Sequence, residues 1–215
     1  MYNKIFGDIS KRELVEKIIF TLIGGLILGF GVAFNAANSW GNDPISVFYD
    51  GLSKAINIDL GLASNITNYT LFAVVFLLGR KYINLGSFIY TLPLGFFISL
   101  GSKFYEFLNI PRDLLGHSFT AVIACVMLFF GVSSFIVANI GLDPWTGLAM
   151  ILKDKTGKQY KVFKVTIDVV VLTLGFILGG KVGITTVVAA FLGGPIIQMM
   201  VNFLKNNIFK HWKNI

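Results

Sequence analysis

Long apolar runs alternate with short polar segments along the chain. The first run, residues 18–37, reads IIFTLIGGLILGFGVAFNAA and holds no charged residue over twenty positions. As a helix rising about 1.5 Å per residue, it would extend about 30 Å, the thickness of a bilayer core. Comparable runs follow, so the pattern predicts six membrane spans, at residues 18–37, 63–79, 85–101, 118–138, 162–179 and 183–204.

Two shorter segments lie between these spans. PISVFYDGLSKAI starts at residue 44 and PWTGLAMILKDK starts at residue 144, and each directly follows an aspartate. Neither segment is long enough to cross a bilayer as a helix. We expect two short helices that lie in the membrane interface or re-enter the membrane, and the pattern does not choose between these two arrangements.

The composition agrees with a membrane protein. The chain of 215 residues is 55% hydrophobic and only 13% charged, with a mean hydropathy of +0.75. A soluble domain carries roughly 25% charged residues. The net charge of +7 would fit a nucleic-acid partner, but the basic residues gather at the ends of the spans, where they are typical of topology signals. No nucleic-acid partner is expected.

The two halves of the chain repeat the same motifs. FGV at residues 30–32 precedes GNDP at 41–44, and FGV at 130–132 precedes GLDP at 141–144. Each repeat holds three predicted spans, an odd number, so the second copy enters the membrane from the opposite side. The sequence predicts one all-α membrane domain, residues 1–215, built from two inverted three-helix repeats at 10–110 and 111–210.

The positive residues give the expected orientation. With a cytoplasmic N-terminus, fourteen of the eighteen Lys and Arg residues lie on the cytoplasmic side and four lie outside. This asymmetry follows the positive-inside rule. Both termini are therefore expected in the cytoplasm.

Each Gly-x-Asp-Pro element predicts a turn followed by a new helix. Pro44 and Pro144 suit the first helical position, Asp43 and Asp143 suit the N-cap, and Gly41 and Gly141 permit a sharp turn. One interpretation stops at this capping role. The other places the helix starts beside a solvent-filled pathway. A carboxylate there repels anions, which favours a cation, an amine or a neutral polar solute.

Polar residues inside the spans are further pathway candidates. Asp168 lies within the fifth predicted span, and Asn68 occupies the matching position of the first repeat. Buried carboxylates in membranes usually face a cavity or a partner. Lys164, one turn earlier, is the alternative local partner of Asp168. Asn35 and Asn38 close the first span and either join the pathway or are solvated at the interface.

Other kinds of site find little support. Cys125 is the single cysteine and lies in an apolar run, and both histidines lie outside the spans. No metal site and no cofactor are expected. The sequence has no nucleotide-binding loop and no Ser-His-Asp set, so an enzyme is not expected.

The doubled FGV…G-x-DP pattern resembles the YczE/YyaS/YitT group of bacterial integral membrane proteins. The resemblance also rests on DPW at 143–145, on NLGS at 84–87 and on Asn68, and it covers residues 15–205. YitT-like members usually carry an extra soluble C-terminal domain, whereas this chain ends in FKHWKNI, which favours the YczE/YyaS side. Ser87 stands where relatives often have Thr. The resemblance implies a multi-pass protein of the bacterial plasma membrane, with transport or export as the suggested role and no agreed substrate.

A small secondary transporter or exporter of a polar solute is the first functional hypothesis, with a homodimer as an open possibility. The alternatives are a substrate-binding membrane subunit of a vitamin importer, a non-transporting scaffold or chaperone, and a uniporter-like channel.

Overall fold

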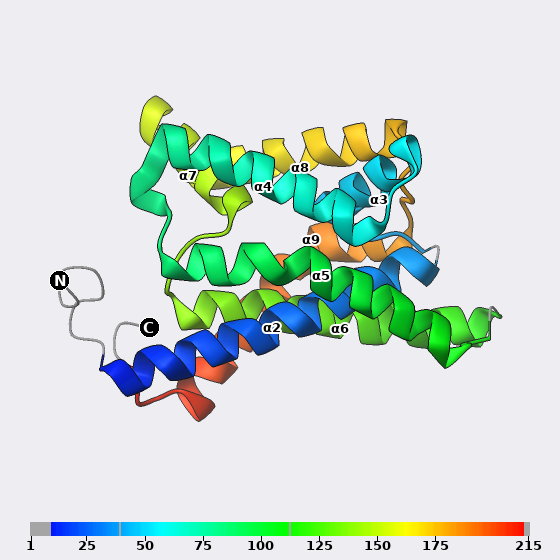
Figure 1. The fold of residues 1–215 in the computed structure, drawn as a ribbon, viewed down its shortest axis with the longest axis horizontal. Helices are drawn as coiled ribbons and strands as arrows, with labels where there is room; N and C mark the ends of the chain where they lie inside the picture. Colours follow the sequence, from blue (N-terminus) through cyan, green and yellow to red (C-terminus); the bar gives the residue numbers. More distant parts are fainter. Residues whose placement is uncertain (1–9, 39, 112, 213–215) are drawn as a thin grey trace.

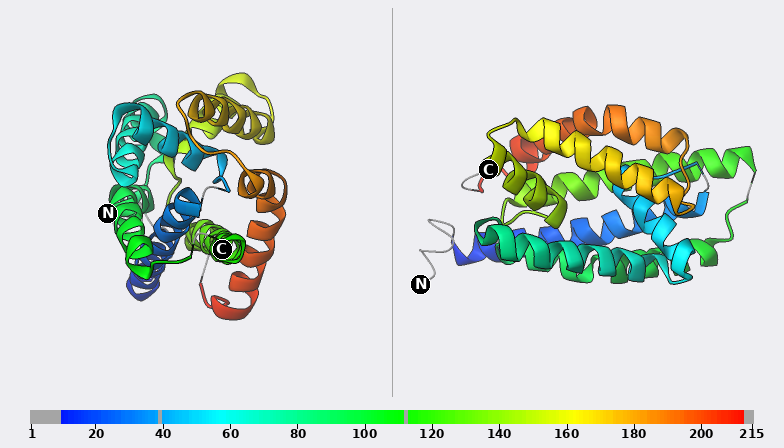
Figure 2. Two further views of the ribbon diagram at one scale, coloured as in Figure 1. Left: turned by 90° about the vertical axis from the view of Figure 1, so that its right-hand side faces the viewer. Right: turned by 90° about the horizontal axis from the view of Figure 1, so that it is seen from above.

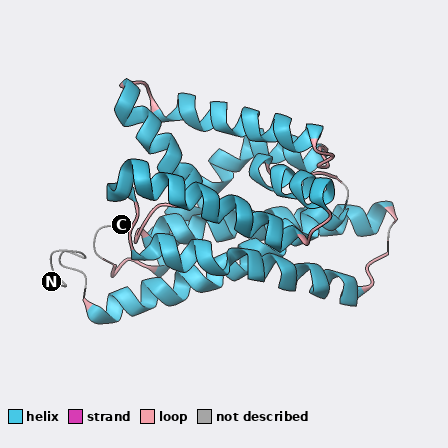
Figure 3. Ribbon diagram, turned by 45° about the horizontal axis from the view of Figure 1, so that its top comes forward, coloured by secondary structure: helices cyan, strands magenta, loops and turns pink. Residues whose placement is uncertain are grey.

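The computed structural model describes residues 10–38, 40–111 and 113–212. Within these residues the chain has eight α-helices and no strand (Figure 3). The helices are α2 (Lys11–Asn38), α3 (Pro44–Ile56), α4 (Leu60–Gly79), α5 (Leu85–Leu108), α6 (Leu114–Ala138), α7 (Pro144–Thr156), α8 (Tyr160–Ile177) and α9 (Ile184–Phe203). A 3₁₀ turn, η1 (Arg80–Tyr82), follows α4, and a π-helical turn, η2 (Leu204–Ile208), follows α9.

Five helices, α2, α4, α5, α6 and α9, are long and apolar enough to cross a membrane. The remaining predicted span coincides with α8, which does not belong to this set. Its 18 residues include three charged ones, Lys161, Lys164 and Asp168. The prediction of five spans agrees with the structure, and the crossing by α8 stays a prediction.

The two short helices lie where the Asp-Pro elements predict them. Both α3 and α7 have 13 residues and begin at the proline. Each ends at a residue in the left-handed region, Asn57 with φ 51° and Gly157 with φ 70°. This conformation is the usual way to stop a helix, and it is easiest for glycine and asparagine.

The long helices lie side by side along the long axis of the molecule, with α4 and α8 on one side and α2, α5 and α6 on the other (Figure 1). The short helices α3 and α7 lie near opposite ends of this arrangement (Figure 1). Helices α2 and α6 run in opposite directions (Figure 1). Figure 2 shows the same arrangement along the long axis and from above.

The antiparallel pair α2 and α6 forms the centre of the packing. Small residues allow the two backbones to approach closely, as is typical of membrane helices. A Cβ atom added to Gly131 would lie 2.5 Å from Cβ of Leu28 and 2.7 Å from the carbonyl oxygen of Gly24. On another face of α2, a Cβ atom added to Gly29 would lie 2.7 Å from Cβ of Phe97 on α5.

Replacing Gly131 by valine is therefore expected to separate α2 from α6. Overpacking of this kind costs about 1–3 kcal/mol. Thermal denaturation of the purified protein in detergent measures the loss. The matched control is Gly194→Ala on α9, where an added Cβ atom meets nothing within 4 Å and where alanine favours the helix. A Gly131→Val variant as stable as the control would contradict the close packing of α2 and α6.

Candidate functional site

The two Asp-Pro elements begin α3 and α7 with side-chain caps. The Asp43 carboxylate accepts a hydrogen bond from the Ser46 backbone N–H at 3.3 Å. The Asp143 carboxylate accepts hydrogen bonds from the backbone N–H groups of Trp145 and Thr146, both at 3.0 Å. Proline follows each aspartate at the helix start. Both aspartates are partly exposed as residues, but the Oδ1 atom of Asp43 is buried.

The preceding glycines serve different needs. Gly41 has φ 92°, which is the left-handed turn expected from the sequence. At Gly141 the need is close packing, because an added Cβ atom would lie 2.6 Å from the Ser87 backbone nitrogen and 2.7 Å from Ser87 Oγ. The expectation of a turn glycine thus describes Gly41, while Gly141 makes room for the start of α5.

Each Gly-x-Asp-Pro element docks on the last long helix of the other half. In the first half, the Trp40 carbonyl accepts from the Thr185 N–H at 3.0 Å. Thr186 Oγ1 accepts from the Asn42 N–H at 3.2 Å, at the start of α9.

The second half repeats the arrangement at the start of α5. The Ile140 carbonyl accepts from the Gly86 N–H at 2.9 Å. Ser87 Oγ accepts from the Leu142 N–H at 3.1 Å. The two sets of bonds have the same pattern with the halves exchanged, so each turn is completed by the opposite half.

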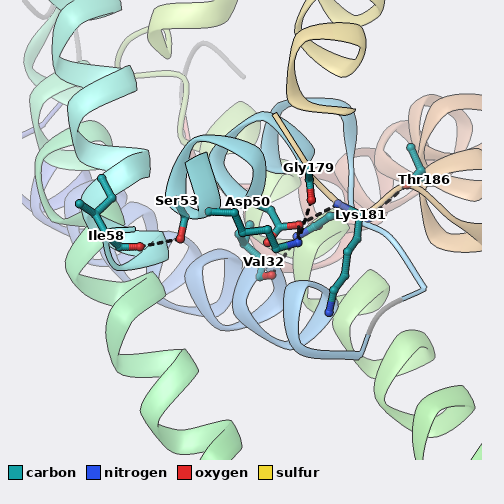
Figure 4. A network of polar contacts seen from close by, with 9 residues as sticks. Val32, Asp50, Ser53, Ile58, Gly179, Lys181 and Thr186 are labelled. Atoms are coloured by element: carbon teal, nitrogen blue, oxygen red, sulfur yellow. Dashed lines mark hydrogen bonds and ion pairs between the residues drawn. The ribbon is translucent and has the colours of Figure 1, made fainter. Parts of the chain in front are cut away.

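The far ends of the short helices are tied down by charged residues. On α3, Asp50 accepts from the Lys181 backbone N–H at 2.8 Å and from Lys54 Nζ at 2.6 Å (Figure 4). Lys54 Nζ also donates to the Gly179 carbonyl at 3.1 Å (Figure 4). These bonds join α3 to the segment between α8 and α9.

On α7 the corresponding tie uses the reverse charge. Asp154, one hundred positions after Lys54, accepts hydrogen bonds from Lys81 Nζ and the Tyr82 hydroxyl. These two donors lower the pKa of Asp154 below its ordinary value, so the carboxylate stays charged at neutral pH. Each short helix is therefore anchored at both ends to the opposite half.

A buried polar network connects α3, α4 and α7. The Tyr49 hydroxyl donates to Asn68 Oδ1 at 3.0 Å, and Trp145 Nε1 donates to both of these oxygens at 3.1 Å. Asn68 Nδ2 donates to Ser64 Oγ at 3.1 Å. Tyr49 and Asn68 are buried, with exposed fractions of 4% and 2%. Asn68 thus shares an oxygen with donors from both short helices.

Charged residues from both halves lie around this network. Asp43 interacts electrostatically with Lys164 and Asp168 on α8, and Asp143 also interacts with Lys164. Among the residues proposed from the sequence, Asn68 is linked directly by the Trp145 hydrogen bond to α7, whose first turn Asp143 caps.

Asp168 forms the local pair that the sequence offered as an alternative. Lys164 Nζ donates to Asp168 Oδ1 at 2.6 Å, and both side chains are partly exposed. The pair satisfies the charge of Asp168.

The two asparagines at the end of α2 are buried in the protein, with exposed fractions of 1% for Asn35 and 0% for Asn38. Interfacial solvation, one of the two predictions for them, is therefore wrong. Asn38 Oδ1 accepts from the Trp40 backbone N–H at 2.8 Å and so supports the turn. Asn35 Oδ1 has no hydrogen-bond partner among the described residues.

Two hollows on the surface lie apart from this region. One is an apolar hollow lined by Phe72, Ala73, Phe76, Leu77 and Phe88, and the other is lined by Ser10, Arg12, Glu13, Glu16 and His211. Neither includes any of the six predicted pathway residues. The described residues hold no group of three or more His, Cys, Asp or Glu side chains suited to a metal ion.

The comparisons with known proteins agree with the helical membrane architecture. A family model described as a family of unknown function, DUF6198, matches residues 15–202. The chain belongs to this family.

Three curated relatives cover most of its length. An uncharacterized protein of Haemophilus influenzae is 25% identical over 91% of this chain and 86% of its own length. The uncharacterized membrane protein YczE of Bacillus subtilis is 25% identical over 87% of this chain and 86% of its own. YyaS of the same organism is 22% identical over 89% and 95%. The resemblance to YczE and YyaS is confirmed, and no solved structure matches.

Two residues of the network were missed from the sequence. Tyr49 and Trp145 both donate to the Asn68 oxygen. Trp145 carried a signal, because it directly follows the Asp-Pro pair. Tyr49 carried none, because an aromatic residue in an apolar helix looks the same whether it faces lipid or a polar cluster.

Replacing Asn68 by alanine is expected to destabilise the protein. The substitution removes the acceptor shared by Tyr49 and Trp145, and an unsatisfied buried donor costs about 1–3 kcal/mol. Thermal denaturation measures the effect. Asn207→Ala is the control, because Asn207 is exposed and donates only within its own helical turn, to the Phe203 carbonyl at 3.0 Å. Equal stability of the two variants would show that the network contributes nothing to folding.

Proposed function

We propose that this multi-pass membrane protein is a small secondary transporter of a polar solute, neutral or cationic, in the bacterial plasma membrane. In this proposal α8 is the sixth span, and the halves 10–110 and 111–210 are inverted repeats. Both termini lie in the cytoplasm. The solute passes between the halves, beside Asp43 and Asp143.

The reciprocal docking of the two Asp-Pro elements carries the proposal. A turn from the first half seats on α9 and a turn from the second half seats on α5, with matching donors and acceptors. Such an exchange is what a two-fold axis between the halves would produce. Inverted repeats with interrupted helices around a central site recur in secondary transporters.

The packing of α4 on α5 in the first half differs from that of the equivalent helices in the second half. Helix α4 packs along α5, where a Cβ atom added to Gly95 would lie 2.2 Å from Asn65 Oδ1. The equivalent pair, α8 and α9, does not pack in this way, and an added Cβ atom on Gly194 meets nothing within 4 Å. We call the contact between α4 and α5 the first seam and the equivalent contact between α8 and α9 the second seam. The first seam is closed and the second is open. This asymmetry is expected of alternating access.

Cysteine labelling tests the orientation. In a Cys125→Ser background, Lys54→Cys and Lys155→Cys place single thiols in the last turns of α3 and α7. The proposal expects an impermeant maleimide to label residue 54 from outside intact cells and residue 155 only after permeabilisation. Labelling of both residues from the same side would exclude the inverted arrangement.

Cross-linking tests the alternation without knowledge of the solute. The rings of Phe72 and Phe88 lie 4.8 Å apart across the closed seam. A Phe72→Cys/Phe88→Cys pair is expected to be joined readily by a short bifunctional thiol reagent. The equivalent pair in the second half, Leu172→Cys/Val187→Cys, is expected to be joined as well, because α8 and α9 close in the alternate state.

The two cross-links are expected to exclude each other in a variant that carries all four cysteines. A Phe72→Cys/Val187→Cys pair controls for random collision, because it joins helices from different seams. If the first pair reacts fully and the second pair reacts no faster than this control, the seams do not alternate and the transport proposal fails.

A further inference from the structure

An apolar hollow opens on the outer surface of the first seam. Its volume is about 380 Å³, and its lining comes from α4 and α5: Phe72, Ala73, Phe76, Leu77 and Phe88. Leu77 is 81% exposed, Phe88 40% and Phe76 38%, so these side chains face outward. Because α4 and α5 are both long and apolar enough to cross a membrane, the hollow offers an aromatic surface to hydrocarbon chains.

The walls of the hollow are held by the packing of the seam. The rings of Phe72 on α4 and Phe88 on α5 meet edge to face, with their centres 4.8 Å apart. One turn before Phe72 and Phe76 begin, the Tyr69 hydroxyl donates to the Leu92 carbonyl at 2.6 Å, which ties the two helices together. A surface that is already formed loses little conformational entropy when it binds a partner.

Arg80 borders the hollow at the end of α4. It follows Phe76 by four positions, and Phe76 follows Phe72 by four, so the three residues share one face of the helix. The Cζ atom of Arg80 lies 5.1 Å from the centre of the Phe76 ring, which is within the range of a cation–π contact. Phe76 thus joins the positive charge to the apolar lining.

The charge of Arg80 is not neutralised by a carboxylate. Its neighbours Lys81 and Tyr82 both donate to Asp154, which fixes the turn η1 on α7. Successive side chains of a 3₁₀ turn point about 120° apart, so Arg80 is directed away from this cluster. Arg80 takes part in none of the ion pairs of the described residues. An exposed guanidinium group therefore remains beside the hollow.

We propose that the hollow and Arg80 together bind an anionic phospholipid, with an acyl chain in the hollow and the phosphate on the guanidinium group. The guanidinium fork matches two phosphate oxygens and stacks on an aromatic ring at the same time. Basic residues between membrane helices near the membrane surface attract the headgroups of anionic lipids. The proposal requires only that α4 and α5 lie in the membrane, so it is independent of transport.

A photoreactive lipid locates the bound chain. The full-length protein is placed in phosphatidylcholine nanodiscs that contain a trace of phosphatidylglycerol with a diazirine in one acyl chain. Phosphatidylcholine with the same diazirine chain is the second probe, in equal amount, and labelled residues are identified by mass spectrometry. We expect labelling to concentrate on residues 72–77 and 88. The phosphatidylglycerol probe is expected to label them about fivefold more, because Arg80 recognises its net negative charge.

Two variants separate the charge from the hollow. Arg80→Gln is expected to lower labelling by the phosphatidylglycerol probe about fivefold, to the level of the phosphatidylcholine probe. Ala73→Phe fills the hollow from an exposed position and is expected to lower labelling by both probes. Arg12→Gln is the matched control, because it removes the same charge from a residue that pairs with Glu16 outside the hollow. An unchanged melting temperature confirms that each variant is folded.

Several results would overturn the proposal. Equal labelling by the two probes, or an Arg80→Gln variant that is labelled like the wild type, would exclude recognition of the headgroup. Even labelling along all the apolar helices would show that no chain is held in the hollow. Displacement of the lipid probe by soluble glycerol phosphate would identify a site for free phosphate. An unlabelled hollow, together with disulfide-linked dimers of a Cys125→Ser/Leu77→Cys variant, would assign the hollow to a second copy of the chain.

Discussion

The structure depends on how two irregular segments, the turns that precede α3 and α7, satisfy their backbone groups. A lipid-exposed turn would leave N–H and C=O groups without partners, which hydrocarbon does not tolerate. Here the turns around Trp40 and Ile140 find their partners on α9 and α5 of the opposite half. Asp43 and Asp143 then satisfy the first free N–H groups of the helices that follow. Two short helices can therefore begin inside the protein and bring polar side chains to its centre.

Much of this fold can be predicted from patterns in the single sequence. The charge-free runs predict the five long apolar helices, and the Asp-Pro pairs predict the starts of α3 and α7. These features are local, since they follow from hydropathy, from proline geometry and from N-cap chemistry. Local hydropathy does not assign helix α8 as a membrane span, because Lys161, Lys164 and Asp168 interrupt its apolar sequence.

The relations across the chain were harder to predict. Nothing near Ser87 or Thr186 indicates that their hydroxyls accept from Leu142 and Asn42, because those partners lie 55 and 144 positions away. The gathering of Tyr49 and Trp145 on Asn68 likewise depends on how α3, α4 and α7 meet. The doubled motif signalled that the halves correspond. It did not signal that each half completes the other.

That exchange has a consequence for how the protein is made. The Trp40 carbonyl receives its N–H donor from Thr185, which the ribosome synthesises 145 residues later. The first turn must wait, solvated or held by other groups, until nearly the whole polypeptide has entered the bilayer. A fragment that ends between α5 and α6 would lack the Thr185 N–H group that bonds to the Trp40 carbonyl. The hydrogen bonds of the Trp40 turn are thus completed only when synthesis of the chain is nearly finished.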